Sequence, residues 1–403
     1  MTSMDLFDNL DRPPELDAAV SRMANHDETN RGAIFTRHEV VEAILDLCGY
    51  RADRPLHRMR LLEPAFGGGD FLVHVVERLL KAYESRGGDP AQAERDLRHA
   101  IRGVELHAET YRKTFSRLQE RLDRWGMQRV AARTLCSAWL LQDDFLLAHL
   151  STTFDFVVGN PPYVRQERIP ATLLSEYRRR FSTLYDRADL YIPFFERSLD
   201  LLSETGTLGF ICANRWLKNR YGGPLREKIS RDFWLRYYMD TEGTEAFHAD
   251  VIAYPAITVL QRRNQQTNAR HVTRTVPANA LTERSLGELA TALLAEPTAS
   301  PWVQQIELTD SGIAPLLLDD VAQLALMQRI ERDFPTLEQT GCKVGIGVAT
   351  GCDEVYIDAF DDLPVEPSRK LPLAMARDLV DDHLLWGGKG VLNPIRARPS
   401  SLG

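Results

Sequence analysis

The chain has 403 residues, of which 44% are hydrophobic and 26% charged, an ordinary globular composition that allows one large domain and a second, smaller one. No apolar stretch is long enough to span a bilayer, and residues 1–10 lack the basic segment and apolar core of a secretory signal. The formal net charge of −8 counts mildly against a nucleic-acid-binding protein, although local basic patches could still contact phosphates.

The cysteines give no sign of a disulfide framework or a zinc site. They are odd in number and lack CxxC spacing: Cys48, Cys136, Cys212, Cys342 and Cys352. The ten histidines show no HExxH pattern. We therefore expect no bound metal and a reduced, cytoplasmic setting.

Hydrophobic periodicity predicts alternating helices and strands after a polar lead over residues 1–25. Four helices are expected over residues 37–48, 71–83, 107–125 and 188–202. Seven strands are expected over residues 59–62, 101–104, 133–139, 154–158, 207–212, 233–239 and 256–260. Such alternation predicts an α/β fold with a doubly wound, mostly parallel, Rossmann-like sheet of seven strands.

A polar stretch over residues 264–270 reads as a linker. The prediction is a catalytic domain over residues 26–263 and a smaller α+β domain over residues 271–403, where the strand–helix–strand rhythm is lost. No internal repeat or low-complexity tract is present.

The most informative motif is Asn160-Pro161-Pro162-Tyr163, directly after the buried strand expected at residues 154–158. Two prolines make a stiff turn, and the carboxyl end of a parallel strand is where open α/β sheets bind ligands. The turn presents a side-chain amide, a backbone carbonyl at Pro161 and an aromatic ring. This set suits a flat substrate that carries an exocyclic amino group.

A glycine-rich turn from Glu63 to Phe71 follows the first strand, without the GxGxxG spacing of a dinucleotide site. A carboxylate at Glu63 would repel a pyrophosphate but suit a cationic ligand, which favours S-adenosylmethionine over NAD. Glu105 ends the second strand, where an acidic side chain binds ribose hydroxyls. Asp144 could accept a hydrogen bond from the cofactor's adenine and Phe145 could cover its ring, with Asp143 as the alternative carboxylate.

With these elements in order, residues 30–262 resemble γ-class adenine-N6 DNA methyltransferases of the type II restriction–modification and phage-exclusion kind. That class has a GAxFT segment before the glycine-rich turn, here Gly32-Ala33-Ile34-Phe35-Thr36. Arg37 stands where the family usually has proline, and Phe66 and Gly68 replace the commoner Cys and Ser or Thr. The resemblance implies S-adenosyl-L-methionine as cofactor and double-stranded DNA as partner, with a separate restriction nuclease or other defence-system subunits as further partners.

The resemblance also assigns roles to individual residues. The expected cofactor-binding residues are Thr36, Glu63, Pro64, Ala65, Phe66, Gly67, Gly69, Glu105, Asp144 and Phe145. The expected catalytic residues are Asn160, Pro161, Pro162 and Tyr163. Phe247 is the candidate for stacking on a flipped base, with core packing as its alternative reading.

Basic residues after the fifth expected strand are candidates for phosphate contacts around the target nucleotide: Arg215, Lys218 and Arg220. Arg226 belongs to the same cluster, whereas Arg178–Arg180 reads better as a solvated helix face. The segment 343–351 resembles the opening of a target-recognition domain, which here is shorter than usual in the family.

Two other classes of function remain open at this point. The same tetrapeptide occurs in protein-glutamine methyltransferases and in some guanine-N2 RNA methyltransferases, because an amide or amino nitrogen poses the same chemical problem. A catalytically impaired DNA-binding specificity subunit is the other alternative. The segment 32–36 and the trailing domain favour DNA methylation.

Overall fold

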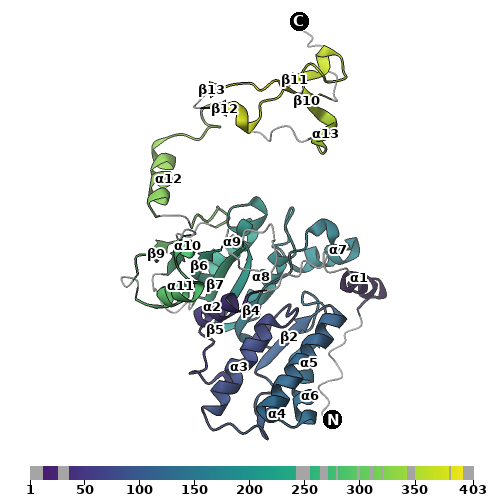
Figure 1. Ribbon diagram of the computed structural model, residues 1–403, viewed down its shortest axis with the longest axis vertical. Coiled ribbons are helices and arrows are strands. Elements are labelled where there is room, and N and C mark those ends of the chain that lie inside the picture. The colour runs from purple at the N-terminus through teal and green to yellow at the C-terminus, as the bar shows by residue number, and fades with distance from the viewer. Residues whose placement is uncertain are drawn as a thin grey trace. The chain divides into compact units, whose positions relative to one another are not determined.

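The computed structural model describes residues 12–25, 36–241, 255–263, 271–277, 280–296, 300–308, 312–318, 321–342, 350–380 and 383–393 (Figure 1). The chain divides into two compact units, residues 1–327 and residues 328–403. Each unit is described by itself below.

The first unit is built on a nine-stranded sheet with the order β3-β2-β1-β4-β5-β7-β6-β8-β9. Five neighbouring strands run parallel: β1 (Leu61–Glu63), β2 (Ile101–Glu105), β3 (Leu140–Gln142), β4 (Phe154–Gly159) and β5 (Leu202–Ala213). Four more continue the sheet beyond β5: β6 (Phe233–Asp240), β7 (Pro255–Arg262), β8 (Val272–Val276) and β9 (Gln304–Glu307). Strand β7 lies antiparallel between β5 and β6. The carboxyl ends of the parallel strands therefore share one edge.

Helices cover both faces of this sheet (Figure 1). One buried cluster includes side chains of α2 (His38–Cys48), α3 (Asp70–Glu84), α5 (Ala108–Trp125), α6 (Arg129–Trp139) and α11 (Leu286–Leu294). The other includes side chains of α1 (Pro14–Ala24), α7 (Ala171–Arg180), α8 (Tyr191–Asp200) and α9 (Gly223–Asp232). The short helices α4 (Ala93–Asp96) and α10 (Ala280–Glu283) complete the unit. This two-sided covering confirms the predicted doubly wound fold.

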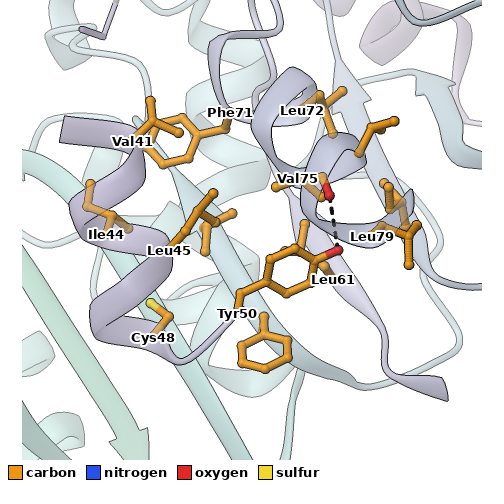
Figure 2. Packing of buried hydrophobic residues seen from close by; sticks show 14 of the residues in the cluster. Val41, Ile44, Leu45, Cys48, Tyr50, Leu61, Phe71, Leu72, Val75 and Leu79 are labelled. Carbon is orange, nitrogen blue, oxygen red and sulfur yellow. Dashed lines mark hydrogen bonds between the residues drawn. The ribbon is translucent and has the colours of Figure 1, made fainter. Parts of the chain in front are cut away.

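Helices α2 and α3 pack closely on the sheet beside the loop that follows β1 (Figure 2). Tyr50 is buried, and its hydroxyl donates to the carbonyl of Val75 in α3 at 3.3 Å. A β-carbon at Gly209 of β5 would lie 2.3 Å from Sγ of Cys48 and 2.8 Å from Cγ2 of Ile44. A glycine at this position therefore lets α2 approach the sheet.

The second unit contains a three-stranded antiparallel sheet of β10 (Ile357–Ala359), β14 (Lys389–Leu392) and β11 (Lys370–Pro372). A separate hairpin pairs β12 (Leu379–Val380) with β13 (His383–Leu384). Helix α13 (Asp353–Tyr356) precedes the sheet, and α12 (Val321–Asp333) spans the division between the units.

Three features differ from the expectations. Residues 133–139, predicted as a strand, belong to helix α6, which buries Ala132, Leu135, Cys136 and Trp139 at helical spacing. The sheet has nine strands rather than seven, because six of the predicted strands form and β3, β8 and β9 are added to them. Since β8 and β9 belong to this sheet, the predicted division after residue 263 differs from the one between the two compact units. Residues 14–24, inside the predicted polar lead, form helix α1.

Within the described part of the chain, no helix combines the length and the apolar character needed to cross a bilayer.

Candidate cofactor and catalytic site

Residues that follow four parallel strands, β1 to β4, line one cavity of about 120 Å³ at the carboxyl edge of the sheet. Of the ten residues predicted to bind a cofactor, all except Gly69 line it: Thr36, Glu63, Pro64, Ala65, Phe66, Gly67, Glu105, Asp144 and Phe145. Asn160 and Pro162 of the catalytic motif line the same cavity. The structure thus brings the predicted cofactor loop and the predicted catalytic turn together.

The loop between β1 and α3 depends on two glycines. Gly67 has φ 48° and Gly69 has φ 81°, a backbone region that favours glycine. A β-carbon at Gly69 would also lie 2.7 Å from Cγ2 of Thr114, so Gly69 shapes the loop without lining the cavity. The Thr114 hydroxyl donates to the Gly67 carbonyl at 2.8 Å and fixes the loop against α5.

Glu63 is a buried carboxylate at the end of β1, with 1% of its surface exposed. Its Oε2 atom is buried and has no hydrogen-bond partner among the described residues. Burial raises the pKa of Glu63 well above its ordinary value, and the nearby charges of Asp70 and Glu105 raise it further. An unsatisfied buried carboxylate oxygen is costly, so this position suits a cationic ligand.

The Glu105 carboxylate holds the loop and still has acceptor capacity. Its Oε2 accepts from the Gly67 backbone N–H and its Oε1 from the His107 N–H, both at 2.8 Å. A carboxylate offers about four lone-pair sites, so ligand hydroxyls can be accepted as well.

The two neighbouring acids both line the cavity but differ in their contacts. Asp144 is buried; its Oδ1 accepts from the Leu146 N–H at 2.8 Å and its Oδ2 from the Tyr177 hydroxyl. Burial raises the pKa of Asp144. Asp143 instead pairs with Arg12 at 2.5 Å. Phe145 packs beside Phe194, with ring centroids 5.0 Å apart.

The catalytic turn is tied directly to the cofactor side. The Asn160 side-chain amide donates to the Thr36 hydroxyl at 3.2 Å, and the Thr36 backbone N–H donates to Oδ2 of Asp70 at 3.0 Å. Asp70 is the first residue of α3. These contacts connect three segments far apart in the sequence: Thr36, the start of α3 and the turn after β4.

The other two motif residues lie differently from Asn160 and Pro162. Neither Pro161 nor Tyr163 is among the residues that line the cavity. The Tyr163 ring lies 6.4 Å from that of Tyr191 in α8, and burial raises the pKa of its phenol well above the ordinary value.

Comparison with known proteins decides the family. Residues 90–247 match the model of the Eco57I restriction-modification methylase family. The chain is 52% identical to Type II methyltransferase M.PaeR7I of Pseudomonas aeruginosa, over 90% of this chain and 63% of that protein. It is 50% identical to M.XhoI of Xanthomonas vasicola (90% and 67%) and 39% identical to M.BstVI of Geobacillus stearothermophilus (93% and 68%). The chain belongs to this family of type II methyltransferases.

The chain thus spans about two thirds of the length of these type II methyltransferases, and less than that of M.PaeR7I. Its fold is similar to that of a solved restriction-modification enzyme, LlaBIII bound to DNA. The TM-score is 0.52 at 16% identity, over 82% of this chain and 25% of that one. LlaGI in complex with a DNA substrate mimic gives 0.51 at 13% identity, over 73% and 32%.

Family membership confirms the motif-based resemblance and supports the predicted cofactor, S-adenosyl-L-methionine. The chemistry of the residues that line the cavity suits that molecule. The unsatisfied Oε2 of Glu63 could accept from its ammonium group, Glu105 from ribose hydroxyls and Asp144 from the adenine amino group.

Sequence reasoning missed the contribution of the N-terminal helix to this cavity. Met23 of α1 lines the cavity, and the Ala24 carbonyl lies 2.8 Å from Nδ1 of His107. Leu16, Ala19 and Met23 are buried at spacings of three and four residues, a narrow apolar stripe that could have identified the helix. Tyr177, which binds Asp144 from 33 residues away, gave no local signal.

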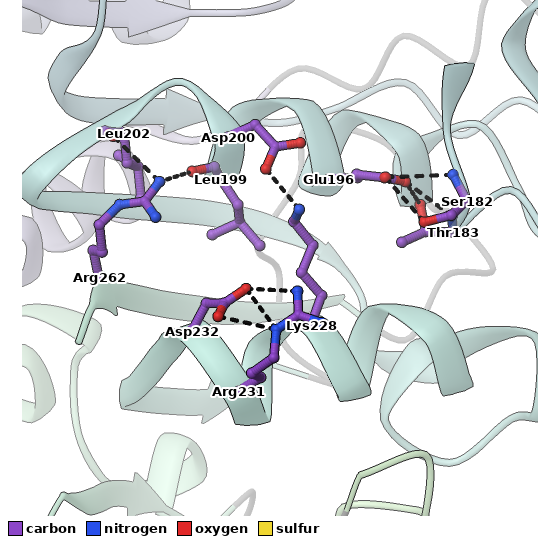
Figure 3. A network of polar contacts seen from close by, with 10 residues as sticks. All are labelled: Ser182, Thr183, Glu196, Leu199, Asp200, Leu202, Lys228, Arg231, Asp232 and Arg262. Carbon is purple, nitrogen blue, oxygen red and sulfur yellow. Dashed lines mark hydrogen bonds and ion pairs between the residues drawn. The ribbon is translucent and has the colours of Figure 1, made fainter. Parts of the chain in front are cut away.

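A polar network joins α8 to α9 and to the segment that follows α7 (Figure 3). Buried Glu196 of α8 accepts from the backbone N–H groups of Ser182 and Thr183, at 3.3 and 2.9 Å, and from both hydroxyls. Lys228 of α9 pairs with Asp200 at the end of α8 at 2.6 Å. These contacts fix the chain that follows Tyr177.

The predicted basic cluster divides into two kinds of residue. Arg215 and Arg220 lie in the short 3-10 turns η3 (Asn214–Leu217) and η4 (Arg220–Gly222), and Lys218 lies between them; all three are exposed. Arg226 is buried and donates to the carbonyls of Trp216, Asn219 and Ile313, so its role is structural. Phe247, residues 32–35 and residues 343–349 lie outside the described residues.

Proposed function

We propose that this chain transfers a methyl group from S-adenosyl-L-methionine to N6 of a flipped-out adenine in double-stranded DNA, as the modification enzyme of a restriction–modification system. The observation that carries the proposal is the position of Asn160. Its amide lies on the cofactor cavity, hydrogen-bonded to Thr36, in a chain that belongs to the type II methyltransferases.

The chemistry follows from the turn after β4. Adenine N6 is a poor nucleophile because its lone pair is delocalised into the ring. The Asn160 side-chain oxygen and the Pro161 carbonyl would each accept one N6 hydrogen, which favours a more nucleophilic nitrogen and stabilises the positive charge that develops on it. Bound S-adenosyl-L-methionine supplies the electrophilic methyl group. The residues from Glu63 to Gly67 would position it, and positioning accounts for much of the rate.

The base must leave the duplex to reach this cavity, because its amino group is inaccessible inside the helix. Tyr163 and Phe247 are proposed to stack on the extruded base, which offsets part of the unstacking cost at roughly 1–3 kcal/mol per stacked base. Pro162 would keep the turn rigid.

Phosphate contacts are proposed for Arg215, Lys218 and Arg220. Replacing each with glutamine should reduce the slope of log affinity against log salt by about 0.9 for each phosphate that the variant no longer neutralises. The measurement is DNA binding at several salt concentrations. Arg179→Gln is the matched control, because Arg179 is an exposed arginine paired with Glu176 on a helix face. An unchanged slope in all three variants would remove these residues from the interface.

Residues 271–403 are proposed to supply part of the target-recognition domain, with a restriction nuclease as a separate partner in a cytoplasmic setting. The chain spans only about two thirds of the relatives' length. The proposal therefore includes the statement that this chain is active by itself.

The function is tested by expression in a host that lacks adenine methylation, followed by sequencing of its genome for modified bases. We expect N6-methyladenine at one short recognition sequence. Purified chain given radiolabelled S-adenosyl-L-methionine should label host DNA. Label that appears in RNA or in a protein glutamine side chain, with none in DNA, would contradict the proposal.

A further inference from the structure

Two histidines and a glutamate meet on the facing sides of α2 and α3, outside the residues that line the cofactor cavity. His38 and Glu42 lie one turn apart on α2, and His74 lies on α3. One nitrogen from each histidine and one oxygen of Glu42 all lie within 4.8 Å of one another. No spacing rule in the sequence identifies this set, because it comes from two helices.

Glu42 lies beside the His74 ring. Its Oε1 atom is 2.9 Å from Nδ1 of His74, in an ion-pair contact whose geometry is not that of a hydrogen bond. The other carboxylate oxygen of Glu42 is held by Arg78, which also pairs with Asp46 at 2.7 Å. Glu42 therefore places negative charge next to the two imidazoles.

The Nε2 atom of His74 faces a second imidazole. His74 Nε2 lies 3.2 Å from His38 Nδ1, and the ring centroids are 4.6 Å apart. Two nitrogens bound to a tetrahedral Zn²⁺ at 2.0–2.1 Å lie about 3.3 Å apart, close to this separation.

We propose that His38 and His74 bind one Zn²⁺ or a similar transition-metal ion between α2 and α3, with Glu42 as the neighbouring carboxylate whose charge favours the cation. Imidazole nitrogens suit zinc, copper and nickel. Water would complete the coordination shell. The local charge is compatible with a cation. The ion pairs next to the two histidines contain three carboxylates (Glu42, Asp46 and Glu77) but only two arginines (Arg78 and Arg121).

The ion would join two helices that both start at the cofactor cavity. Thr36 precedes α2 by two residues and Asp70 begins α3, and these two residues are themselves hydrogen-bonded. A metal bridge between His38, at the start of α2, and His74, one turn into α3, would hold Thr36 in place. We therefore expect the metal to raise the melting temperature of the chain.

The test uses the full chain, freed of metal with a chelator and carrying Cys342→Ser and Cys352→Ser, because these exposed thiols could bind zinc themselves. Titration with Zn²⁺ against a chromophoric chelator should give one ion per chain. Titration with Co²⁺ should give the absorption of a low-coordinate site with nitrogen ligands. His38→Ala should abolish the site, and Glu42→Gln should weaken it because it removes a negative charge beside the ion.

His38 is exposed, so its replacement should leave the fold intact. His99→Ala, at another exposed histidine, is the matched control and should bind the ion like the parent chain. Circular dichroism verifies folding in every variant. The proposal is overturned by the absence of stoichiometric binding in the parent chain, or by equal binding in His38→Ala and the parent. The contact between His38 and His74 would then be an ordinary hydrogen bond.

Discussion

Asn160→Ala is expected to reduce kcat for methyl transfer by about 10²–10³-fold or more, the range measured when one preorganised hydrogen-bonding group that stabilises a transition state is removed. The substitution deletes the acceptor proposed for one N6 hydrogen. It leaves Glu63, Glu105 and Asp144 in place, so affinity for S-adenosyl-L-methionine should change by only a few-fold. Single-turnover kinetics and calorimetric cofactor binding measure the two quantities separately.

Thr36→Val separates direct catalysis from positioning. It removes the hydroxyl that accepts from the Asn160 amide at 3.2 Å but leaves the amide itself. We expect a smaller loss of kcat than in Asn160→Ala, because the amide loses its orientation and not its oxygen. A loss of cofactor affinity in Asn160→Ala as large as its loss of rate would show that Asn160 serves the fold of the cavity rather than the chemistry.

Sequence reasoning located the parts of this site that follow directly from buried strands. Glu63, Glu105 and Asn160 each stand at the carboxyl end of an apolar run, and the sheet brings such ends to one edge. Hydrophobic runs and glycine-rich turns are local signals, so these placements could be read from short stretches of chain.

The features that sequence reasoning missed depend on contacts between distant segments. The link from Tyr177 to Asp144 requires α7 to fold back on the turn after β3, which no short pattern encodes. The prediction of a strand over residues 133–139 is wrong for a local reason. Leu135, Cys136 and Trp139 of α6 are buried at spacings of three and four residues, which is the period of a helix and not of a strand.

Glu63→Gln is expected to weaken S-adenosyl-L-methionine binding by roughly 10–150-fold, which corresponds to the 1.5–3 kcal/mol of a hydrogen bond to a charged group. The variant keeps the size of the side chain but removes the negative charge proposed to receive the ammonium group.

Glu63→Gln should also change the stability of the folded chain. Because the folded-state pKa of Glu63 is raised, the protonated form contributes stability at low pH that is lost as pH rises through the folded pKa.

Glu63→Gln cannot ionise at this position, so it does not lose stability as the pH rises. Without cofactor it should therefore melt at a higher temperature than the parent chain at neutral pH. The Leu72 backbone N–H that hydrogen-bonds the Glu63 carboxyl can still donate to the amide oxygen. Thermal melts with and without S-adenosyl-L-methionine measure both effects. A variant that is less stable without cofactor would show that the ionised Glu63 is already compensated by the protein.

Proton linkage gives a sharper test of the same residue. Binding of a cation should favour the ionised carboxylate, so cofactor binding should release a proton wherever free Glu63 is still protonated. Affinity should then rise with pH as Glu63 ionises, above the ordinary glutamate pKa. Calorimetry in two buffers of different ionisation enthalpy counts the protons released on binding. The measurements are made between pH 5 and 7, because an α-amino group such as that of the cofactor titrates only at about 7.7–8.0. Glu63→Gln should remove the part of the release that comes from this carboxylate. Equal release in both proteins would mean that the cation is received elsewhere in the cavity.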